Sequence, residues 1–363
     1  MEERNFNFCI TEVYNLNNEF YYEARSLKYN NIKVLIFSFG EFLYGDCFNI
    51  NGEIQIPSNA YQKYLLVQGV YGVFYYPEIK LLDLKKSNFF LEFVLFLKNN
   101  FRLHIRKTFD YPYSSFIEGL ILGIRTEIPE DLMESFNKVG LTHILAISGY
   151  NISIIILFIF ASFYFLSKGL RIFFSVIVIV FFVALIGFSA SVVRAAIMGS
   201  ISLLALFFGR NYIVFFSLLI SVFLMTLFNP LSLIYDVAFH LSVLATLGII
   251  LFSDRLKTFF SFIPSKFMMR ESLVMTLSAQ ILVLPYVIYR FSAFSVIAPL
   301  VNLFVLPFIP FLMFLSFFTV LFSYFSQFLS VFLSFFSFLI MKFIFSLVKF
   351  FSSFDFVYFQ FDK

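Results

Sequence analysis

Residues 172–208, IFFSVIVIVFFVALIGFSASVVRAAIMGSISLLALFF, decide the fold class of this chain. As a single helix at 1.5 Å per residue the stretch would be about 55 Å long, far more than the ~30 Å hydrocarbon core of a bilayer. It must therefore form two membrane-spanning helices, and GFSAS at residues 187–191 is the expected break. One charged residue, Arg194, lies within the second helix.

The rest of the chain has the composition of a membrane protein. Hydrophobic residues make up 60% of its 363 residues and charged residues 13%, against roughly 45–50% and 25% in soluble domains. Further spans fit 141–166, 212–228, 233–252, 272–289 and 294–317, with one or two more in 318–352. We predict a polytopic α-helical membrane protein of about seven to nine spans, some of them broken.

The first 88 residues predict β structure instead. NIKVLIFSF (31–39) and YLLVQGVYGVFYY (64–76) are rich in the β-branched and aromatic residues that favour strands. Asn51-Gly52 lies between two alternating runs and favours a type I′ hairpin, because both central residues of that turn need positive φ. A small β-barrel or β-sandwich over 1–88 is the simplest expectation.

Residues 89–139 are expected to form amphipathic helices at the membrane surface. An apolar run from residue 89 ends in four cations that would bind lipid phosphate: Lys98, Arg102, Arg106 and Lys107. A short true span is the alternative. Pro129 near the start and Gly140 just past the end mark a second short helix.

Loop charges predict the orientation, because short cytoplasmic loops carry an excess of Lys and Arg. One side has only Arg290, whereas the other has seven cations: Lys168, Arg171, Arg210, Arg255, Lys257, Lys266 and Arg270. The loops that carry the seven cations are therefore expected in the cytoplasm, which puts residues 1–140 outside it and leaves residues 140–363 as the multi-pass bundle.

Charge and cysteine content restrict the possible functions of the predicted N-terminal β domain, called here the front domain. Residues 1–110 carry 12 Lys/Arg and 12 Asp/Glu, so this domain is not a basic nucleic-acid module. Cys9 and Cys47 would form a disulfide if the domain faces outward, or remain small buried residues if it is cytosolic. Because His and Cys are sparse and no Gly-rich phosphate loop occurs, we predict no metal, no cofactor and no enzyme.

Arg194 is the main candidate for function, because an ionisable residue within a span is costly. Helical spacing places Gly187, Ala190 and Ser191 on its face, a small-residue surface that lets helices approach closely. Arg194 either pairs with backbone carbonyls or an acid at a helix crossing, with Asp236 the nearest by predicted depth, or lines an aqueous path for an anion.

Other polar residues within the spans are candidates for the same path. In GLTHILAISGYNISII (140–155), Ser148-Gly149 allows a close approach or a break, Ser148 and Asn151 could face water, and His143 would lie at the interface. Three more residues either make interhelical contacts or line the path: His240, Gln280 and Asn302. Four prolines suggest broken helices beside a cavity: Pro285, Pro299, Pro307 and Pro310.

Three blocks resemble one family, the ComEC competence proteins. EGLILGIRTEIPEDLMESFNKVGLTHILAISGYNISII (118–155) resembles its ALLLGxR helix followed by GLxHLLAISGLH. VVRAAIMGSISLLALFFGR with NPLSLIYDVAFHLSVLATLGII, within 192–250, and AQILVLPYVIYRFSAFSVIAPLVNLFVLP (279–307) are similar to its later motifs, in the family's order. YGDCFNINGEIQIP (44–57) resembles the start of the family's extracytoplasmic OB-type domain.

The resemblance implies an inner-membrane channel that takes single-stranded DNA into the cytoplasm during natural transformation. Its partners would be single-stranded DNA, membrane lipid, a receptor, a helicase or ATPase, a separate nuclease and, in a homo-oligomer, a second copy of the chain. Two departures are Tyr150-Asn151 where Leu-His is usual and His240 where Gln is usual. We expect no metallo-β-lactamase-like nuclease in this chain. A non-conducting membrane scaffold or vestigial relative is the alternative.

Overall fold

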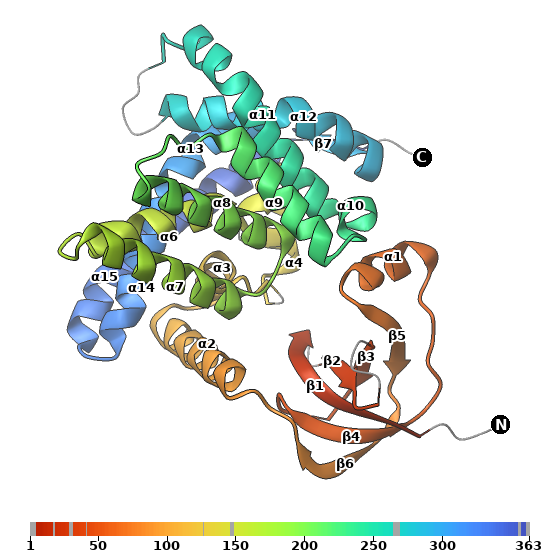
Figure 1. Cartoon of the computed structure of the whole chain (residues 1–363). Helices are drawn as coiled ribbons and strands as arrows, with labels where there is room; N and C mark the ends of the chain where they lie inside the picture. Colours follow the sequence, from red (N-terminus) through yellow and green to blue (C-terminus); the bar gives the residue numbers. More distant parts are fainter. Residues whose placement is uncertain are drawn as a thin grey trace. The chain divides into compact units, whose positions relative to one another are not determined.

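A computed structural model describes residues 5–16, 19–28, 32–40, 42–125, 127–145, 149–263, 269–354 and 357–360 (Figure 1). The chain divides into two compact units. The first contains residues 1–97 and 226–236, and the second contains residues 98–225 and 237–363. Each unit is described by itself.

The first unit is built on a six-stranded sheet, which confirms β structure at the N-terminus. The strands lie in the order β5-β3-β2-β1-β4-β6. All neighbours are antiparallel except β3 and β5, which are parallel. Their bounds are β1 (Asn5–Leu16), β2 (Glu19–Ser26), β3 (Lys33–Ser38), β4 (Asp46–Asn51), β5 (Val70–Tyr75) and β6 (Glu78–Lys85). Among the described strands β5 and β6 lie at opposite edges, so the sheet is not shown closed into a barrel.

The two faces of the sheet bury different apolar groups. One face packs alternate residues into the main core of the unit, including Phe8, Ile36, Phe48 and Phe74. On the other face Leu35, Val70 and Val73 pack with Leu65, which lies on helix α1 (Asn59–Val67). Since aliphatic residues occur on both faces, the strands are apolar on two sides where α1 covers them.

Two local expectations for this unit are wrong. No hairpin forms at Asn51-Gly52, because β4 pairs with β1 and β6, and neither residue is among the described positions with positive φ. The chain instead leaves the sheet, and Gln55 makes an isolated bridge to Val73. The predicted strand from residue 64 is also wrong at its start, since residues 64–67 belong to α1 and β5 begins only at Val70.

The first unit also includes a segment distant in the sequence. The short helix α10 (Ser232–Tyr235) lies in a connector that contacts α1. Asn229 donates a hydrogen bond from Nδ2 to the Val67 carbonyl oxygen at 2.7 Å. The ammonium of Lys63 lies over the ring of Tyr235, 5.7 Å from its centre. The turn that begins NPLS is therefore held by α1.

The second unit begins with helices too polar or too short to span a membrane. These are the later part of α2 (Phe89–Thr108), then α3 (Tyr113–Ile117), a π-helical turn η1 (Glu118–Leu122), α4 (Glu130–Lys138) and α5 (Thr142–Leu145). The helix expected between Pro129 and Gly140 is α4, with Pro129 directly before it. Leu132 and Phe136 are its buried residues, and they join the largest apolar core of the molecule.

Six helical segments of the described chain are long and apolar enough to cross a membrane. They are α7 (Lys168–Ile186), α8 (Ala190–Phe207), α11 (Val237–Phe259), α12 (Met269–Phe291), the run 298–323 and α15 (Gln327–Ser352). The break predicted at 187–191 is confirmed, since α7 ends at Ile186 and α8 begins at Ala190. Six is fewer than the seven to nine expected, because α6 (Gly149–Ser162) and α9 (Val214–Phe228) have only 14 and 15 residues.

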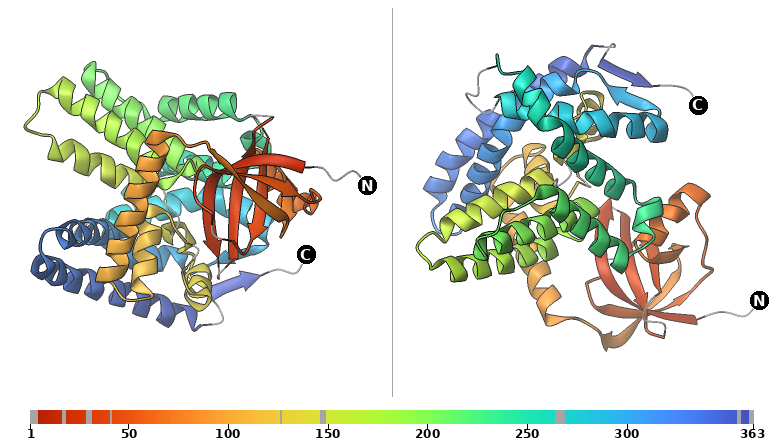
Figure 2. Two further views of the ribbon diagram at one scale, coloured as in Figure 1. Left: turned by 90° about the horizontal axis from the view of Figure 1, so that it is seen from below. Right: turned by 45° about the horizontal axis from the view of Figure 1, so that its top comes forward.

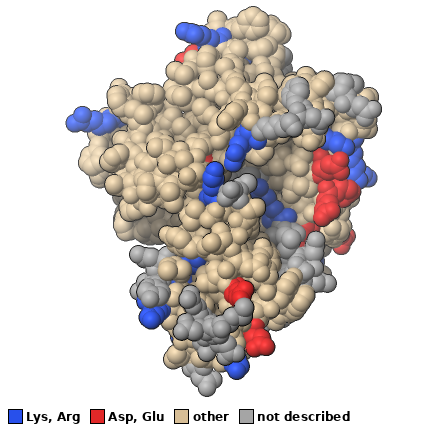
Figure 3. Space-filling view, turned by 90° about the vertical axis from the view of Figure 1, so that its right-hand side faces the viewer, with Lys and Arg blue, Asp and Glu red and all other residues tan. Residues whose placement is uncertain are grey.

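One span is interrupted at its prolines, as predicted, whereas α12 continues as a single helix through Pro285. Pro285 lies inside α12. The run 298–323 consists of α13 (Ala298–Val305), a 3₁₀ turn at Leu306–Phe308 and α14 (Ile309–Ser323), with a Pro early in each. Helices α14 and α15 lie side by side (Figure 2), and a small sheet joins β7 (Ala293–Ser295) to β8 (Tyr358–Gln360). Most of the described surface in Figure 3 carries no charged residue, as a lipid-facing protein requires.

Candidate functional site

Arg194 lies in the first half of α8 and is only 8% exposed. Its Nε donates a hydrogen bond to the Ser242 hydroxyl at 2.7 Å, and its Nη1 donates to the hydroxyl of Thr246. Ser242 and Thr246 are one helical turn apart on α11, so both reach the same face of α8. The Thr246 hydroxyl donates its own hydrogen to the Ser242 carbonyl oxygen at 3.0 Å. Its lone pairs are thereby oriented to accept from the guanidinium.

The other edge of the guanidinium lies against the start of α6. A Cβ added to Gly149 would be 2.9 Å from Nη2 of Arg194 and 3.6 Å from the Cβ of Ala195. This spacing leaves no room for a side chain unless Arg194 moves. Asn151, in the first turn of the same helix, is 1% exposed. Ser148, which was expected to share this site, lies outside the described residues.

The partners of Arg194 are neutral. Besides the two hydroxyls, Nη1 lies 3.7 Å from the sulfur of Met198. None of the ion pairs found in the described part of the chain includes Arg194, so Asp236, the expected partner, is not bound to it. The structure thus brings together Gly149 of α6 and Arg194 of α8, with hydroxyls from α11. Among the described residues, this arrangement presents a cation without a neutralising carboxylate.

The remaining expected path residues lie elsewhere. Nδ1 of His240 is 2.7 Å from the Tyr286 hydroxyl, joining α11 to α12. Gln280 lines an open, mostly apolar groove with Leu256 and Pro285. Asn302 is 3% exposed on α13 and its Oδ1 accepts no hydrogen bond from the described residues. His143 is exposed, with Nδ1 3.2 Å from the Gly140 carbonyl oxygen.

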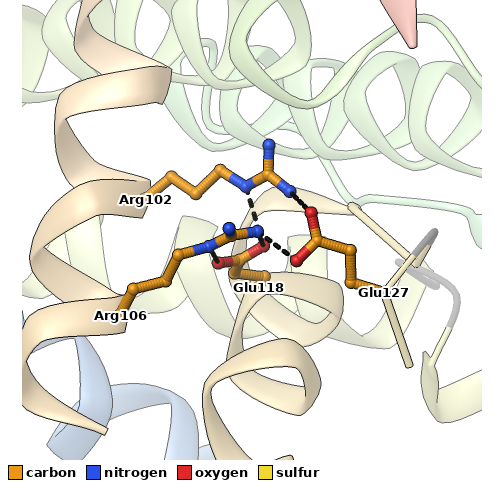
Figure 4. A network of polar contacts seen from close by, with 4 residues as sticks. All are labelled: Arg102, Arg106, Glu118 and Glu127. Atoms are coloured by element: carbon orange, nitrogen blue, oxygen red, sulfur yellow. Dashed lines mark hydrogen bonds and ion pairs between the residues drawn. The ribbon is translucent and has the colours of Figure 1, made fainter. Parts of the chain in front are cut away.

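A second polar cluster was missed by sequence reasoning (Figure 4). Glu118, 1% exposed on η1, accepts from Nε of Arg102 at 2.9 Å and from Nε of Arg106 at 2.6 Å. Glu127 accepts from Arg102 at 2.6 Å and also from Arg106. These two arginines therefore bind carboxylates of the chain, where lipid phosphate was expected. Two features of the sequence could have indicated this cluster. They are an acid inside the apolar run FIEGLIL and two Arg one turn apart on α2.

The electrostatics of this cluster favour its charged state. Burial opposes ionisation of Glu127, but the hydrogen bonds and charges of Arg106 and Arg102 outweigh it and lower the pKa of Glu127. Hydrogen bonding to Glu118 raises the pKa of Arg106 above its ordinary value. The ion pairs thus join each of the two arginines to both carboxylates.

The sheet carries a third candidate surface, a ladder of aromatic rings. Tyr21, Phe37 and Tyr75 are register partners across β2, β3 and β5. The rings of Phe37 and Tyr75 stack with centres 5.1 Å apart and planes 11° apart. Exposed rings lie at its margins on α1 and beyond the strand ends: Tyr61, Tyr64, Phe39 and Tyr76.

Cys9 and Cys47 are directly opposed on β1 and β4. Their sulfur atoms are 1.97 Å apart in the structure, and both side chains are buried. Elsewhere in the described chain, no three His, Cys, Asp or Glu side chains gather closely enough to hold a metal ion.

Comparison with known proteins adds the following. A family model described as "Competence protein" matches residues 120–363, well over half of the chain. Over 191 residues the chain is 27% identical to ComE operon protein 3 of Bacillus subtilis (strain 168). That match covers 52% of this chain but 24% of the relative, so the chain corresponds to about a quarter of that protein's length. No solved structure matches.

Proposed function

The chain belongs to the competence protein family of membrane proteins, and we propose that it is a channel through which single-stranded DNA enters the cytoplasm. The observation that carries the proposal is the extent of the family match. Residues 120–363 contain all six helical segments long enough to span a membrane, and also Arg194. Family membership implies a role in DNA uptake, and conduction through this bundle is the step that we add.

The chemistry of the bundle is compatible with passage of a polyanion. A strand of phosphates needs a wall that water wets, with few fixed cations, so that it is attracted but not trapped. Hydroxyl and amide side chains are buried on several spans, including Ser242 and Asn302. Arg194 is a buried cation without a carboxylate partner among the described residues, so its charge is available to a passing anion.

We further propose an inner-membrane location with the sheet domain outside, as the loop cations favour, and an OB-type relationship for that domain. Its aromatic ladder would stack the bases of an arriving strand, because every base has a π-face and stacking tolerates any sequence. The partners would be single-stranded DNA, lipid and other proteins of the uptake machinery.

The test is flux of single-stranded DNA into lipid vesicles. Vesicles with the purified full chain inserted are given a fluorescent oligonucleotide outside, and external DNA is then removed by nuclease. We expect nuclease-protected DNA inside these vesicles and none in empty ones. A vesicle preparation with another polytopic protein of similar size controls for leakage. Protection equal to that of empty vesicles, together with normal transformation in a deletion strain, would establish the non-conducting scaffold instead.

A further inference from the structure

The charge balance around Arg194 is incomplete. A lone cation removed from water costs several kcal/mol even after relaxation, and hydroxyl groups offset only part of this cost. Ser242, Thr246 and Met198 orient the guanidinium without neutralising it. Buried arginines are more often paired with carboxylates, so the surroundings of Arg194 call for an anion that is not part of the described chain.

Helix ends add to the positive potential at this point. Helix α6 begins at Gly149, beside the guanidinium, and α8 begins at Ala190, one turn before Arg194. The N-terminus of a helix carries a partial positive charge, roughly half an elementary charge. The two helix ends have the same sign as the guanidinium, so they raise its energy when no anion is present. All three favour an anion placed next to Nη2.

The contacts of Arg194 determine which edge of its guanidinium faces α6. Nε and Nη1 are held by α11, which leaves Nη2 directed toward α6. Gly149 contributes no side chain there, and a Cβ would come within 2.9 Å of Nη2. Asn151, two residues further along α6, is a buried amide in the first turn of the same helix.

We infer that Arg194, held by Ser242 and Thr246 and approached over Gly149, forms a subsite for one phosphodiester of a single strand. The inference rests on the proposed function for the identity of its ligand. Among the described residues, the site offers one cation and no side chain placed to distinguish bases. Arg194 is therefore a sequence-independent contact, and Gly149 is the position whose lack of a side chain lets α6 lie close to Nη2.

The test compares two oligonucleotides and matched variants of the full chain in lipid nanodiscs. One oligothymidylate has ordinary phosphodiester linkages, and the other has uncharged methylphosphonate linkages. Arg194→Gln removes the cation, Gly149→Ala crowds it without changing charge, and Arg210→Gln is the matched control, because Arg210 is an exposed cation just after α8.

We expect Arg194→Gln to weaken binding of the phosphodiester strand about tenfold, as loss of one charge-assisted contact does. The slope of log affinity against log salt should become shallower by about 0.7, the value for one phosphate of a single strand. Gly149→Ala should weaken the same strand to a smaller extent. Binding of the methylphosphonate strand should be equal in all variants, and Arg210→Gln should match the native chain.

Two results overturn the inference. One is an unchanged affinity and salt slope for Arg194→Gln. The other is an equal loss on both oligonucleotides, which indicates structural damage; should Arg194→Gln fail to fold, Gly149→Ala decides by the same criteria. Vesicle flux separates this outcome from failure of the proposed function. If the native chain conducts DNA and Arg194→Gln conducts and binds equally well, only the subsite is wrong.

Discussion

Gly248 on α11 marks a close approach of this helix to α12. A Cβ at this position would be 2.4 Å from the Ser278 carbonyl oxygen and 3.3 Å from the Cα of Ala279, both on the backbone of α12. Backbone cannot move aside as a side chain does. We expect Gly248→Ala to lower the free energy of unfolding by about 1–3 kcal/mol through overpacking, measured by denaturation in detergent micelles.

The control for Gly248 is a helical glycine with space around it. A Cβ on Gly169, in the first turn of α7, would meet the Phe207 ring at an ordinary 3.5 Å. Gly169→Ala should leave stability unchanged or raise it by up to about 1 kcal/mol, since Ala is the better helix former. Equal behaviour of the two variants would show that α11 and α12 do not meet as closely as described.

Glu127 gives the stability of the second unit a defined pH dependence. Its pKa is lowered in the folded chain, although burial opposes this, because Arg106 and Arg102 bind the carboxylate. A carboxylate whose pKa is lower in the folded chain than its unfolded value of about 4.3 stabilises the fold at pH values above that unfolded pKa. This stabilisation is lost as the pH falls through the folded pKa. The difference in melting temperature between the native chain and Glu127→Gln should therefore be largest near pH 7 and shrink below about pH 4.3.

An exposed pair provides the comparison for Glu127. Glu134 binds Lys138 at 2.9 Å within α4, with its side chain 66% exposed. Because exposed pairs contribute little, Glu134→Gln should change the melting temperature by less at every pH. A difference for Glu127→Gln that is constant from neutral to acidic pH would contradict the role assigned to its charge.

Among elements, the later part of α2 depends on one buried carboxylate. Glu118 binds both Arg102 and Arg106, and removing its charge leaves two partly buried cations short of a partner. We expect Glu118→Gln to cost about 3 kcal/mol, as breaking buried pairs does, and to increase hydrogen exchange in residues 98–108. Glu92→Gln, which removes an exposed pair with Lys85, should cost far less than Glu118→Gln. Similar exchange in both variants would rule out Glu118 as the anchor of α2.

The aromatic ladder makes a separate prediction for the sheet. Tyr75 is 46% exposed on the edge strand β5, at the end of the stacked series. If bases extend this series, Tyr75→Ala should weaken binding of single-stranded DNA by about 1–3 kcal/mol. Tyr164→Ala, at a 77% exposed tyrosine between α6 and α7, should have no effect. Equal affinities measured by fluorescence anisotropy would leave the ladder a structural feature of the sheet.

Sequence signals predicted an element well where nearby residues alone determine where it begins and ends. The break near 187–191 followed from helix length against bilayer thickness, and α4 followed from Pro129 near its start and Gly140 just past its end. Prediction failed where distant strands decide. Asn51-Gly52 has a strong turn signal, but β4 is already paired on both edges by β1 and β6. For α1 a signal existed, since Gly69, with φ 76°, lies just past its end as helix-terminating glycines do.

The candidate site was only half predictable for the same reason. Arg194 was identified as a candidate because an ionisable side chain is costly in hydrocarbon. Gly149 and Asn151 were identified because a glycine and an amide interrupt an apolar run. The partners of Arg194 could not be derived, because Ser242 and Thr246 are 48 and 52 residues away and ordinary in type. Asp236 was the nearest acid by predicted depth, whereas the structure supplies the hydroxyls of Ser242 and Thr246.

At the scale of the whole molecule, orientation connects the loop charges, the cysteines and the function. Seven cations at the ends of α6, α8 and α11 would all lie in the cytoplasm if the shorter helices α6 and α9 also cross the membrane, and the sheet domain would then lie outside, as proposed above. There the cell is oxidising, so Cys9 and Cys47, opposed on neighbouring strands, should be bridged. After denaturation, both should resist alkylation until a reductant is added.

Labelling of intact cells tests the same orientation independently. Lys80→Cys and Lys257→Cys place single new thiols at exposed positions on β6 and near the end of α11. We expect a membrane-impermeant maleimide to label the first in intact cells and the second only after permeabilisation. The reverse pattern, with freely alkylated Cys9 and Cys47, would place the sheet domain in the cytoplasm. The aromatic ladder would then lie at the exit for a strand rather than at its entrance, and the direction proposed for DNA movement past Arg194 would have to be reconsidered.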